Sequence, residues 1–210
     1  MNEQRFDDYP AEGAYPTEVT HMSARDAIER LRKGNETYLA TNANAGDTSQ
    51  ATIEWLFEEG QAPFACVVSC ADSRVVPEHI FATGLGELFC IRVAGNVIGD
   101  MELASCVYAV EHLNVPLVVV LGHTHCGAIE AAMEAVAGAA PAADHALAPL
   151  VGSIARVIGN ETDPYAAAVA NVRAGISAIE ADPEIAHLEA SGLEVRGAIY
   201  HTHSGTVEFL

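Results

Sequence analysis

The chain has 210 residues, 50% of them hydrophobic, and it carries a formal net charge of −19. This composition excludes wholesale disorder and can build one well-buried domain, and the absence of a long apolar run argues against a membrane span. Because the negative charge repels phosphate backbones and anionic lipid, we expect no nucleic acid and no membrane among the partners.

The acidity is accompanied by a shortage of lysine, since Lys33 is the single lysine of the chain. Such a surface stays hydrated in high salt, which indicates a halophilic protein, although an ordinary acidic protein is the simpler alternative. The acidic N-terminus does not resemble a secretory signal, so we expect a cytoplasmic protein. The five cysteines form an odd number, which favours buried thiols or metal ligands over a disulfide framework.

Residues 1–60 are predicted to form an N-terminal arm and helix. The beginning of the arm lacks regular periodicity. Ser23 then begins a predicted helix, with Asp26 in the first turn and a partly apolar face beyond it. Residues 41–50 are expected to form a loop, and residues 52–59 a short helical turn.

Residues 61–137 contain the strongest strand signals. Three apolar, β-branched runs predict buried parallel strands, at 64–69, 88–93 and 116–122. Stretches compatible with helices separate or follow them, at 77–82, 101–113 and 127–137. This alternation predicts an α/β fold with a mostly parallel central sheet flanked by helices.

Residues 138–210 complete the predicted fold. A loop at 138–146 precedes helical patterns at 148–158 and 164–180, and the chain ends in two strands around a Ser-Gly turn. We therefore expect a single catalytic domain over residues 1–210, with an N-terminal helical arm and a C-terminal strand pair.

Three candidate metal ligands fall just beyond two of the predicted strands. Cys70 follows the first strand, and His123 and Cys126 follow the third. If these strands are neighbours, both loops open into one crevice at the carboxyl edge of the sheet. Two thiolates and one imidazole suit Zn²⁺ and leave a fourth position for water, although buried, inert thiols would give the same pattern.

Asp72 and Arg74 favour a catalytic site over inert thiols. They follow Cys70 by two and four residues. A metal-bound water needs a hydrogen-bond acceptor, and that acceptor needs an orienting partner, which an ordinary loop does not.

Three motifs in register resemble the signature of β-class carbonic anhydrases: Cys-Ala-Asp-Ser-Arg (70–74), Arg-Val-Ala-Gly-Asn (92–96) and Gly-His-Thr-His-Cys-Gly (122–127). The resemblance implies reversible hydration of CO₂ to bicarbonate and a proton. It also implies one Zn²⁺ per subunit on the three ligands and attack on CO₂ by zinc-bound hydroxide. In this mechanism Asp72 accepts the hydrogen bond of the hydroxide, and Arg74 orients Asp72. The assembly implied is a homodimer or a dimer of dimers.

The same resemblance implies a substrate pocket formed by Gln61, Phe89, Ala94, Tyr108 and Gly127. One subgroup of the family has an allosteric bicarbonate site built on a tryptophan, and here Val67 occupies that position and Ser69 replaces the subgroup's glycine. We therefore expect no such allosteric site. Asp72 would serve as a fourth metal ligand only in a closed low-pH form.

The two thiolates also lead to a prediction about pH. They make the zinc site formally neutral, an ionised Asp72 would add negative charge, and Arg74 is the natural offset for that charge, so the hydration activity should rise with pH above neutrality. Four histidines are candidates for carrying the released proton by residue type alone, His79, His125, His201 and His203.

Three alternatives remain open from the sequence. A hydrolase of carbon disulfide or a related heterocumulene could use the same scaffold and ligands, and a non-catalytic zinc or redox-sensing protein could use the same thiols. The repeated His-Thr-His (123–125 and 201–203) suggests an imidazole-bound hydrolase site, which is disfavoured because no carboxylate closely follows either repeat.

Overall fold

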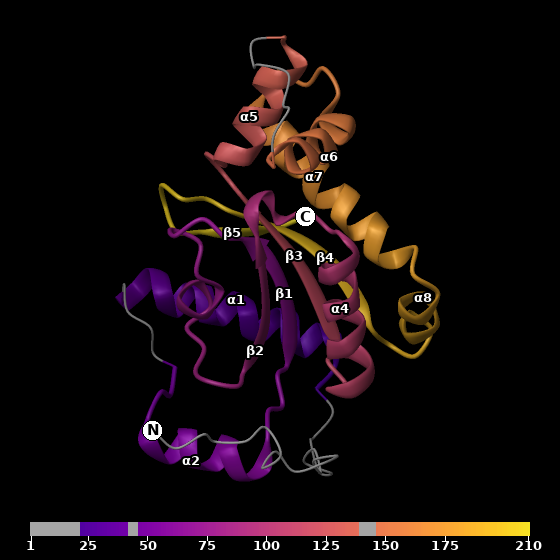
Figure 1. Ribbon diagram of the computed structural model, residues 1–210. Coiled ribbons are helices and arrows are strands. Elements are labelled where there is room, and N and C mark those ends of the chain that lie inside the picture. Colours follow the sequence, from indigo (N-terminus) through magenta and orange to yellow (C-terminus); the bar gives the residue numbers. More distant parts are fainter. Residues whose placement is uncertain (1–21, 42–45, 139–145) are drawn as a thin grey trace, which may run out of the picture.

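The computed structural model describes residues 22–41, 46–138 and 146–210. Its centre is a five-stranded sheet of order β2-β1-β3-β4-β5, in which the first four strands are parallel and β5 is antiparallel (Figure 1). The predicted mostly parallel sheet with a closing strand pair is confirmed. The strands are β1 (Ala65–Cys70), β2 (Leu88–Val93), β3 (Leu117–His123), β4 (Glu194–Tyr200) and β5 (Val207–Phe209).

Helices cover both faces of this sheet. One face packs against α1 (Ala24–Thr41) and the short α3 (Pro77–Ile80). The other packs against α4 (Asp100–His112), α7 (Pro164–Glu180) and α8 (Pro183–Glu189). Every residue of β1 and of β3 is buried, as expected for central strands covered on both sides.

Two further helices stand beyond the carboxyl ends of the strands, α5 (Gly127–Val136) and α6 (Ala148–Ile158) (Figure 1). They form a third, smaller apolar cluster that includes Cys70 and Cys126. The helix α2 (Gln50–Glu59) buries none of its side chains, and it leaves Phe57 89% exposed. The helices α5 and α6 thus cover the carboxyl edge of the sheet, as a buried site requires.

Local sequence signals set several boundaries as predicted. The Ser23 hydroxyl accepts a hydrogen bond from the Asp26 backbone N–H at 3.1 Å and so caps α1. The helices α6 and α7 have the predicted bounds, whereas α2 begins two residues early because Ser49 caps it through the Thr52 N–H.

The helix α8 and the 3₁₀ turn η2 (Ala94–Asn96) were not predicted. Asp182 caps α8, and Pro183 occupies its first turn, a local signal that the apolar periodicity alone does not reveal. The predicted irregular arm and most of the predicted loop at 138–146 lie outside the described residues.

Candidate metal centre

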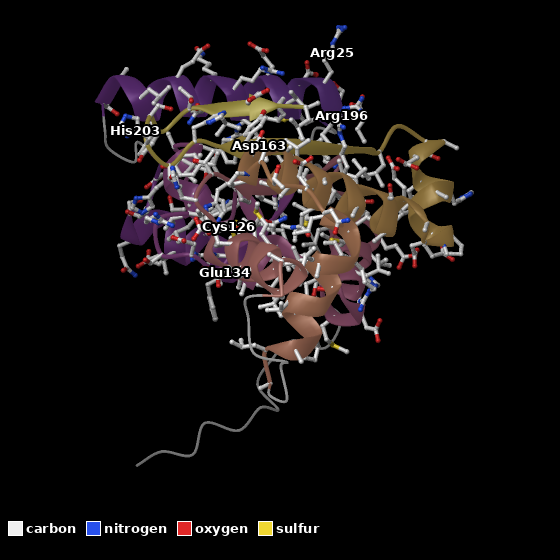
Figure 2. The ribbon with its side chains drawn as sticks, turned by 90° about the horizontal axis from the view of Figure 1, so that it is seen from above. Arg25, Cys126, Glu134, Asp163, Arg196 and His203 are labelled. Atoms are coloured by element: carbon white, nitrogen blue, oxygen red, sulfur yellow. The ribbon has the colours of Figure 1, made fainter. Side chains whose placement is uncertain are left out.

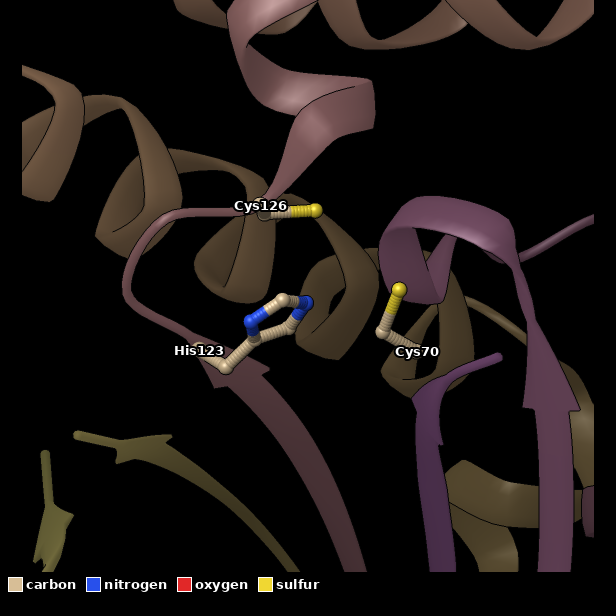
Figure 3. A group of neighbouring side chains, drawn as sticks. All are labelled: Cys70, His123 and Cys126. Atoms are coloured by element: carbon tan, nitrogen blue, oxygen red, sulfur yellow. The ribbon is translucent and has the colours of Figure 1, made fainter. Parts of the chain in front are cut away.

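The three predicted ligands meet at the carboxyl edge of the sheet. The strands β1 and β3 are hydrogen-bonded neighbours, so Cys70, the last residue of β1, lies beside His123, the last residue of β3. Cys126 is the N-cap of α5. The ligand atoms all lie within 4.8 Å of one another, and their side chains point toward a common centre (Figure 3). Viewed from above, Cys126 lies near the middle of the molecule, whereas Arg25 and His203 lie toward its periphery (Figure 2).

His123 presents one ring nitrogen to this centre. Its Nδ1 lies 3.0 Å from the Thr124 carbonyl oxygen, which fixes the ring when Nδ1 carries the proton. Its Nε2 is buried and has no hydrogen-bond partner among the described residues. Burying such an atom is costly unless a ligand satisfies it. This unsatisfied nitrogen, pointed at two sulfur atoms, fits a metal ion.

The Cys70 sulfur is surrounded by donors. It accepts hydrogen bonds from the backbone N–H groups of Asp72 at 3.4 Å and Gly95 at 3.3 Å. Its pKa is lowered to about 4, first by the adjacent Cys126 thiol, which acts as a donor, and then by His123 and the two backbone groups. The same interaction, together with burial, raises the pKa of Cys126. The two sulfurs thus lie close together in a setting that favours a thiolate at Cys70, which suits a soft cation.

The turn η2 is shaped so that Gly95 can reach this sulfur. Gly95 has φ 67° and ψ 16°, a left-handed conformation that glycine adopts without strain. A Cβ at this position would lie 2.8 Å from Ile154 Cδ1 and 3.0 Å from Ala128 Cβ. Both the backbone conformation and the packing therefore require glycine here.

Asp72 and Arg74 form the predicted dyad at the rim of the centre. The Arg74 side chain donates from Nε to Asp72 Oδ1 at 3.0 Å and from Nη2 to Oδ2 at 2.7 Å. This bidentate pair holds the pKa of the Asp72 carboxyl well below its usual range. The guanidinium also donates to the His125 carbonyl at 3.0 Å, so it ties the loop after β1 to the loop after β3.

Two residues of the centre were missed by sequence reasoning. Arg92 lies in a recognised motif, and its guanidinium donates to the Asp72 carbonyl at 2.8 Å and more weakly to the Cys70 carbonyl at 3.4 Å. Asn171, on α7, donates from Nδ2 to the Gly95 carbonyl at 2.8 Å. The sequence holds no clear signal for Asn171, because the same helix also carries Arg173 and Ser177.

The five predicted pocket residues do not lie together within one chain. Ala94 belongs to η2 and Gly127 begins α5, so both flank the metal ligands. Phe89 pairs with Cys66, four residues before Cys70 on β1, which places it about 13 Å down the strand. Its ring contacts that of Tyr108, with centroids 6.0 Å apart. Gln61 precedes β1 and lies at the opposite end of that strand.

The histidines considered for proton transfer differ in their distance along the chain from the ligands. His125 lies in the loop between His123 and Cys126. His201 directly follows Tyr200, the residue paired with His123, and its Nε2 lies 3.2 Å from Glu208 Oε2. Their role in proton transfer stays a prediction.

Fold and centre together define a class of protein. It is an α/β protein with a candidate metal centre of two cysteines and one histidine, in the crevice at the carboxyl edge of a parallel sheet and beside a carboxylate–guanidinium pair. Within the described residues no helix is both long enough and apolar enough to span a bilayer.

Comparisons with known proteins identify the family. A model of the carbonic anhydrase family matches residues 65–207. A carbonic anhydrase of Pseudomonas aeruginosa is 35% identical over 164 residues, 71% of this chain and 74% of that protein. Carbonic anhydrase 2 of Mycobacterium tuberculosis is 46% identical over 110 residues, and this match spans about half of each protein, 52% and 53%.

Among solved structures, the β-carbonic anhydrase CcaA superimposes with a TM-score of 0.64 and 27% identity, over 89% of this chain and 98% of that one. The chain belongs to the β-class carbonic anhydrase family, as its three motifs predicted.

Proposed function

We propose that this chain catalyses the zinc-dependent, reversible hydration of carbon dioxide to bicarbonate and a proton. The observation that carries the proposal is the convergence of Cys70, His123 and Cys126 beside the Asp72–Arg74 pair. Two thiolates and one imidazole are a ligand set of catalytic zinc sites, which keep one position open for water. When bound there, zinc would supply an acidified water as the nucleophile.

Asp72 has the properties of a hydrogen-bond acceptor for this water. Its carboxyl is ionised near neutrality, as an ordinary aspartate is, and Arg74 lowers its pKa further; an ionised carboxylate can only accept hydrogen bonds. Arg74 orients it through two parallel hydrogen bonds. A closed low-pH form with Asp72 as a fourth ligand would require this bidentate pair to open.

The charge of the centre determines how the activity depends on pH. Two thiolates formally neutralise Zn²⁺, and the charge of Asp72 is offset by its pairing with Arg74, so the nucleophilic water should lose its proton less readily than at a site of neutral imidazoles. We expect hydration activity to increase with pH above neutrality. A flat profile between about pH 6 and 9 would contradict this charge argument.

We infer that the active assembly is a homodimer or a dimer of dimers. Gln61, Phe89 and Tyr108 lie too far from the metal ligands of their own chain to share a pocket with Ala94 and Gly127. A pocket containing all five residues would need a second copy of the chain. The strand β2 is at the edge of the sheet, and the exposed Phe57 of α2 and Met101 of α4 offer apolar surface for such a contact. Sedimentation of a monomer with full activity would refute the inference.

Stopped-flow measurement of CO₂ hydration tests the proposed reaction. We expect the wild type to accelerate hydration, Cys126→Ser to lose zinc and activity together, and Asp72→Ala to keep zinc and lose about a hundredfold in rate. A wild type that hydrolyses carbon disulfide but does not hydrate CO₂ would favour the heterocumulene alternative. A wild type that binds zinc without either activity would favour a sensor.

We propose further that the protein is adapted to high salt. The support is the net charge of −19 with Lys33 as the single lysine. Thermal unfolding should shift to higher temperature between dilute buffer and molar potassium chloride. The opposite shift would identify an ordinary acidic protein.

A further inference from the structure

A residue in the last quarter of the chain contacts the turn that lies beside the candidate metal centre. Asn171 lies on α7, is 5% exposed, and donates from Nδ2 to the Gly95 carbonyl at 2.8 Å. The N–H group of the same glycine donates to the Cys70 sulfur at 3.3 Å. We propose that Asn171 is a positioning residue that holds the Gly95 backbone so that its N–H group points at the Cys70 ligand sulfur. This inference rests on the proposed metal site.

The turn needs such an anchor because glycine does not fix its own backbone. Gly95 can exchange left-handed and right-handed conformations at little cost, and each exchange would swing its N–H group away from the sulfur. The hydrogen bond from Asn171 fixes the peptide that follows Gly95, while the sulfur contacts the peptide that precedes it. With both neighbouring peptides held, the orientation of Gly95 is determined.

The position of Asn171 is set by the close packing of α7 against the sheet. Its neighbour Val172 packs into the space left by two glycines. A Cβ at Gly122 would lie 2.6 Å from Val172 Cγ2, and one at Gly197 would lie 2.8 Å from Val172 Cγ1. Because α7 lies this close to the sheet, the side chain of Asn171, which precedes Val172, reaches the Gly95 carbonyl in η2. A small displacement of α7 would therefore move Gly95 and weaken its hydrogen bond to the Cys70 sulfur.

A hydrogen bond to a ligand sulfur matters for the metal as well as for the fold. Such contacts set the orientation and basicity of the ligand, and removing comparable outer partners typically lowers metal affinity or activity by about tenfold to a hundredfold. Cys70 accepts two such hydrogen bonds, and the donor from Asp72 is local to its own loop. The donor from Gly95 is the one whose position depends on a distant helix.

The chain offers a matched control in Asn35. It is 6% exposed, and its Nδ2 donates to the carbonyls of Ile80 at 3.1 Å and Gly205 at 2.9 Å. Its Oδ1 accepts from the Val207 N–H at 3.0 Å. Asn35 is thus an equally buried amide that joins backbone segments without contacting the centre. Replacing it should destabilise the fold and leave the metal site intact.

The experiment compares Asn171→Leu with Asn35→Leu, and adds Asn171→Asp, which keeps the size and removes the amide donor. Zinc affinity is measured by competition with a chelator, and the cobalt-substituted proteins are compared by their thiolate-to-metal charge-transfer absorption. We expect both Asn171 variants to bind zinc about tenfold to a hundredfold more weakly and to shift this absorption. Asn35→Leu should lower only the unfolding temperature.

Equal metal affinity and equal absorption in all three variants would overturn the inference. If the variants fail to fold, NMR of the cadmium-substituted wild type decides, because a coupling between the metal and the Gly95 amide proton requires the N–H···S hydrogen bond. Its absence would also overturn the inference. A wild type that binds no zinc would instead refute the proposed function.

Discussion

Two cysteines of β1 each have a second cysteine beside them, and only one of these two pairs belongs to the candidate metal centre. Cys66 and Cys106 are fully buried at 0% exposure, and Cys70 and Cys126 are nearly as buried at 5% and 4%. Cys66 and Cys70 stand four residues apart on one strand, so their side chains point to the same side of the sheet. Residue type and burial therefore do not distinguish the two pairs.

The difference lies in what surrounds each sulfur. Cys66 has the Cys106 thiol beside it in an apolar core, and this neighbour, together with burial, raises its pKa. Its strand is hydrogen-bonded on both sides, to β2 and to β3. Cys70 ends the strand, where backbone N–H groups leave the ladder and two of them turn toward its sulfur. A strand end can offer donors to a thiolate, whereas the middle of a strand cannot.

The largest expected effect separates the two pairs directly. Cys126→Ser should reduce the bound zinc from about one ion per chain to background, because a serine hydroxyl is a poor ligand for this metal. Cys106→Ser should keep its zinc and lose only stability. Atomic emission analysis of the purified proteins measures both. Loss of zinc from Cys106→Ser would show that the second pair supports the metal centre.

A smaller effect is expected at the turn that supplies one of the donors. Gly95→Ala would place a side chain in a left-handed conformation and against Ile154, so the free energy of unfolding should fall by about 2–4 kcal/mol and zinc should bind more weakly. Gly60→Ala is the control, since Gly60 has φ 82° with nothing within 4 Å of an added Cβ. It should lose about 1–3 kcal/mol, because its ψ of −171° at positive φ is a conformation that side chains other than glycine strain to adopt, and it should keep its zinc affinity. Denaturant titration and chelator competition report the two quantities, and equal behaviour of both variants would contradict the assignment.

The smallest effect concerns the pH dependence of stability. Folding raises the pKa of Cys66, so above about pH 8.5 the unfolded thiol loses its proton while the folded one keeps it. The unfolded state then binds fewer protons, and Cys66 should reduce the free energy of unfolding by up to about 1.4 kcal/mol per pH unit as the pH rises. Urea titrations at several alkaline pH values should show a shallower decline for Cys66→Ala than for the wild type. Parallel declines would mean that Cys66 ionises normally in the fold.

Much of the fold could be predicted because its signals are local. The apolar runs of β1 and β3 are short, continuous and β-branched, and a buried parallel strand requires that pattern. Asp72 and Arg74 are two residues apart, so their pairing needs no knowledge of the rest of the chain. The ligands His123 and Cys126 are likewise close in sequence and lie at a strand end and a helix start.

Other features depended on contacts between distant segments. That Cys70 meets His123 follows only from the pairing of β1 with β3, which is set by how whole strands pack. Asn171 reaches Gly95 across 76 positions of the sequence, through the close packing of α7 against glycines of the sheet. Phe89 and Tyr108 match pocket positions of the family, yet the register of β2 places Phe89 away from the ligands of its own chain, and Tyr108 on α4 packs against Phe89.

The sequence by itself determined the ligands, the dyad and the strands, because residue type and short-range spacing decide which atoms can bind a metal and which segments are buried. Only the tertiary structure decided which buried cysteine has backbone donors and which asparagine holds them in place. The physical reason is that a hydrogen bond to a sulfur needs a correctly oriented N–H group, and that orientation is imposed by helices and strands far away in the chain.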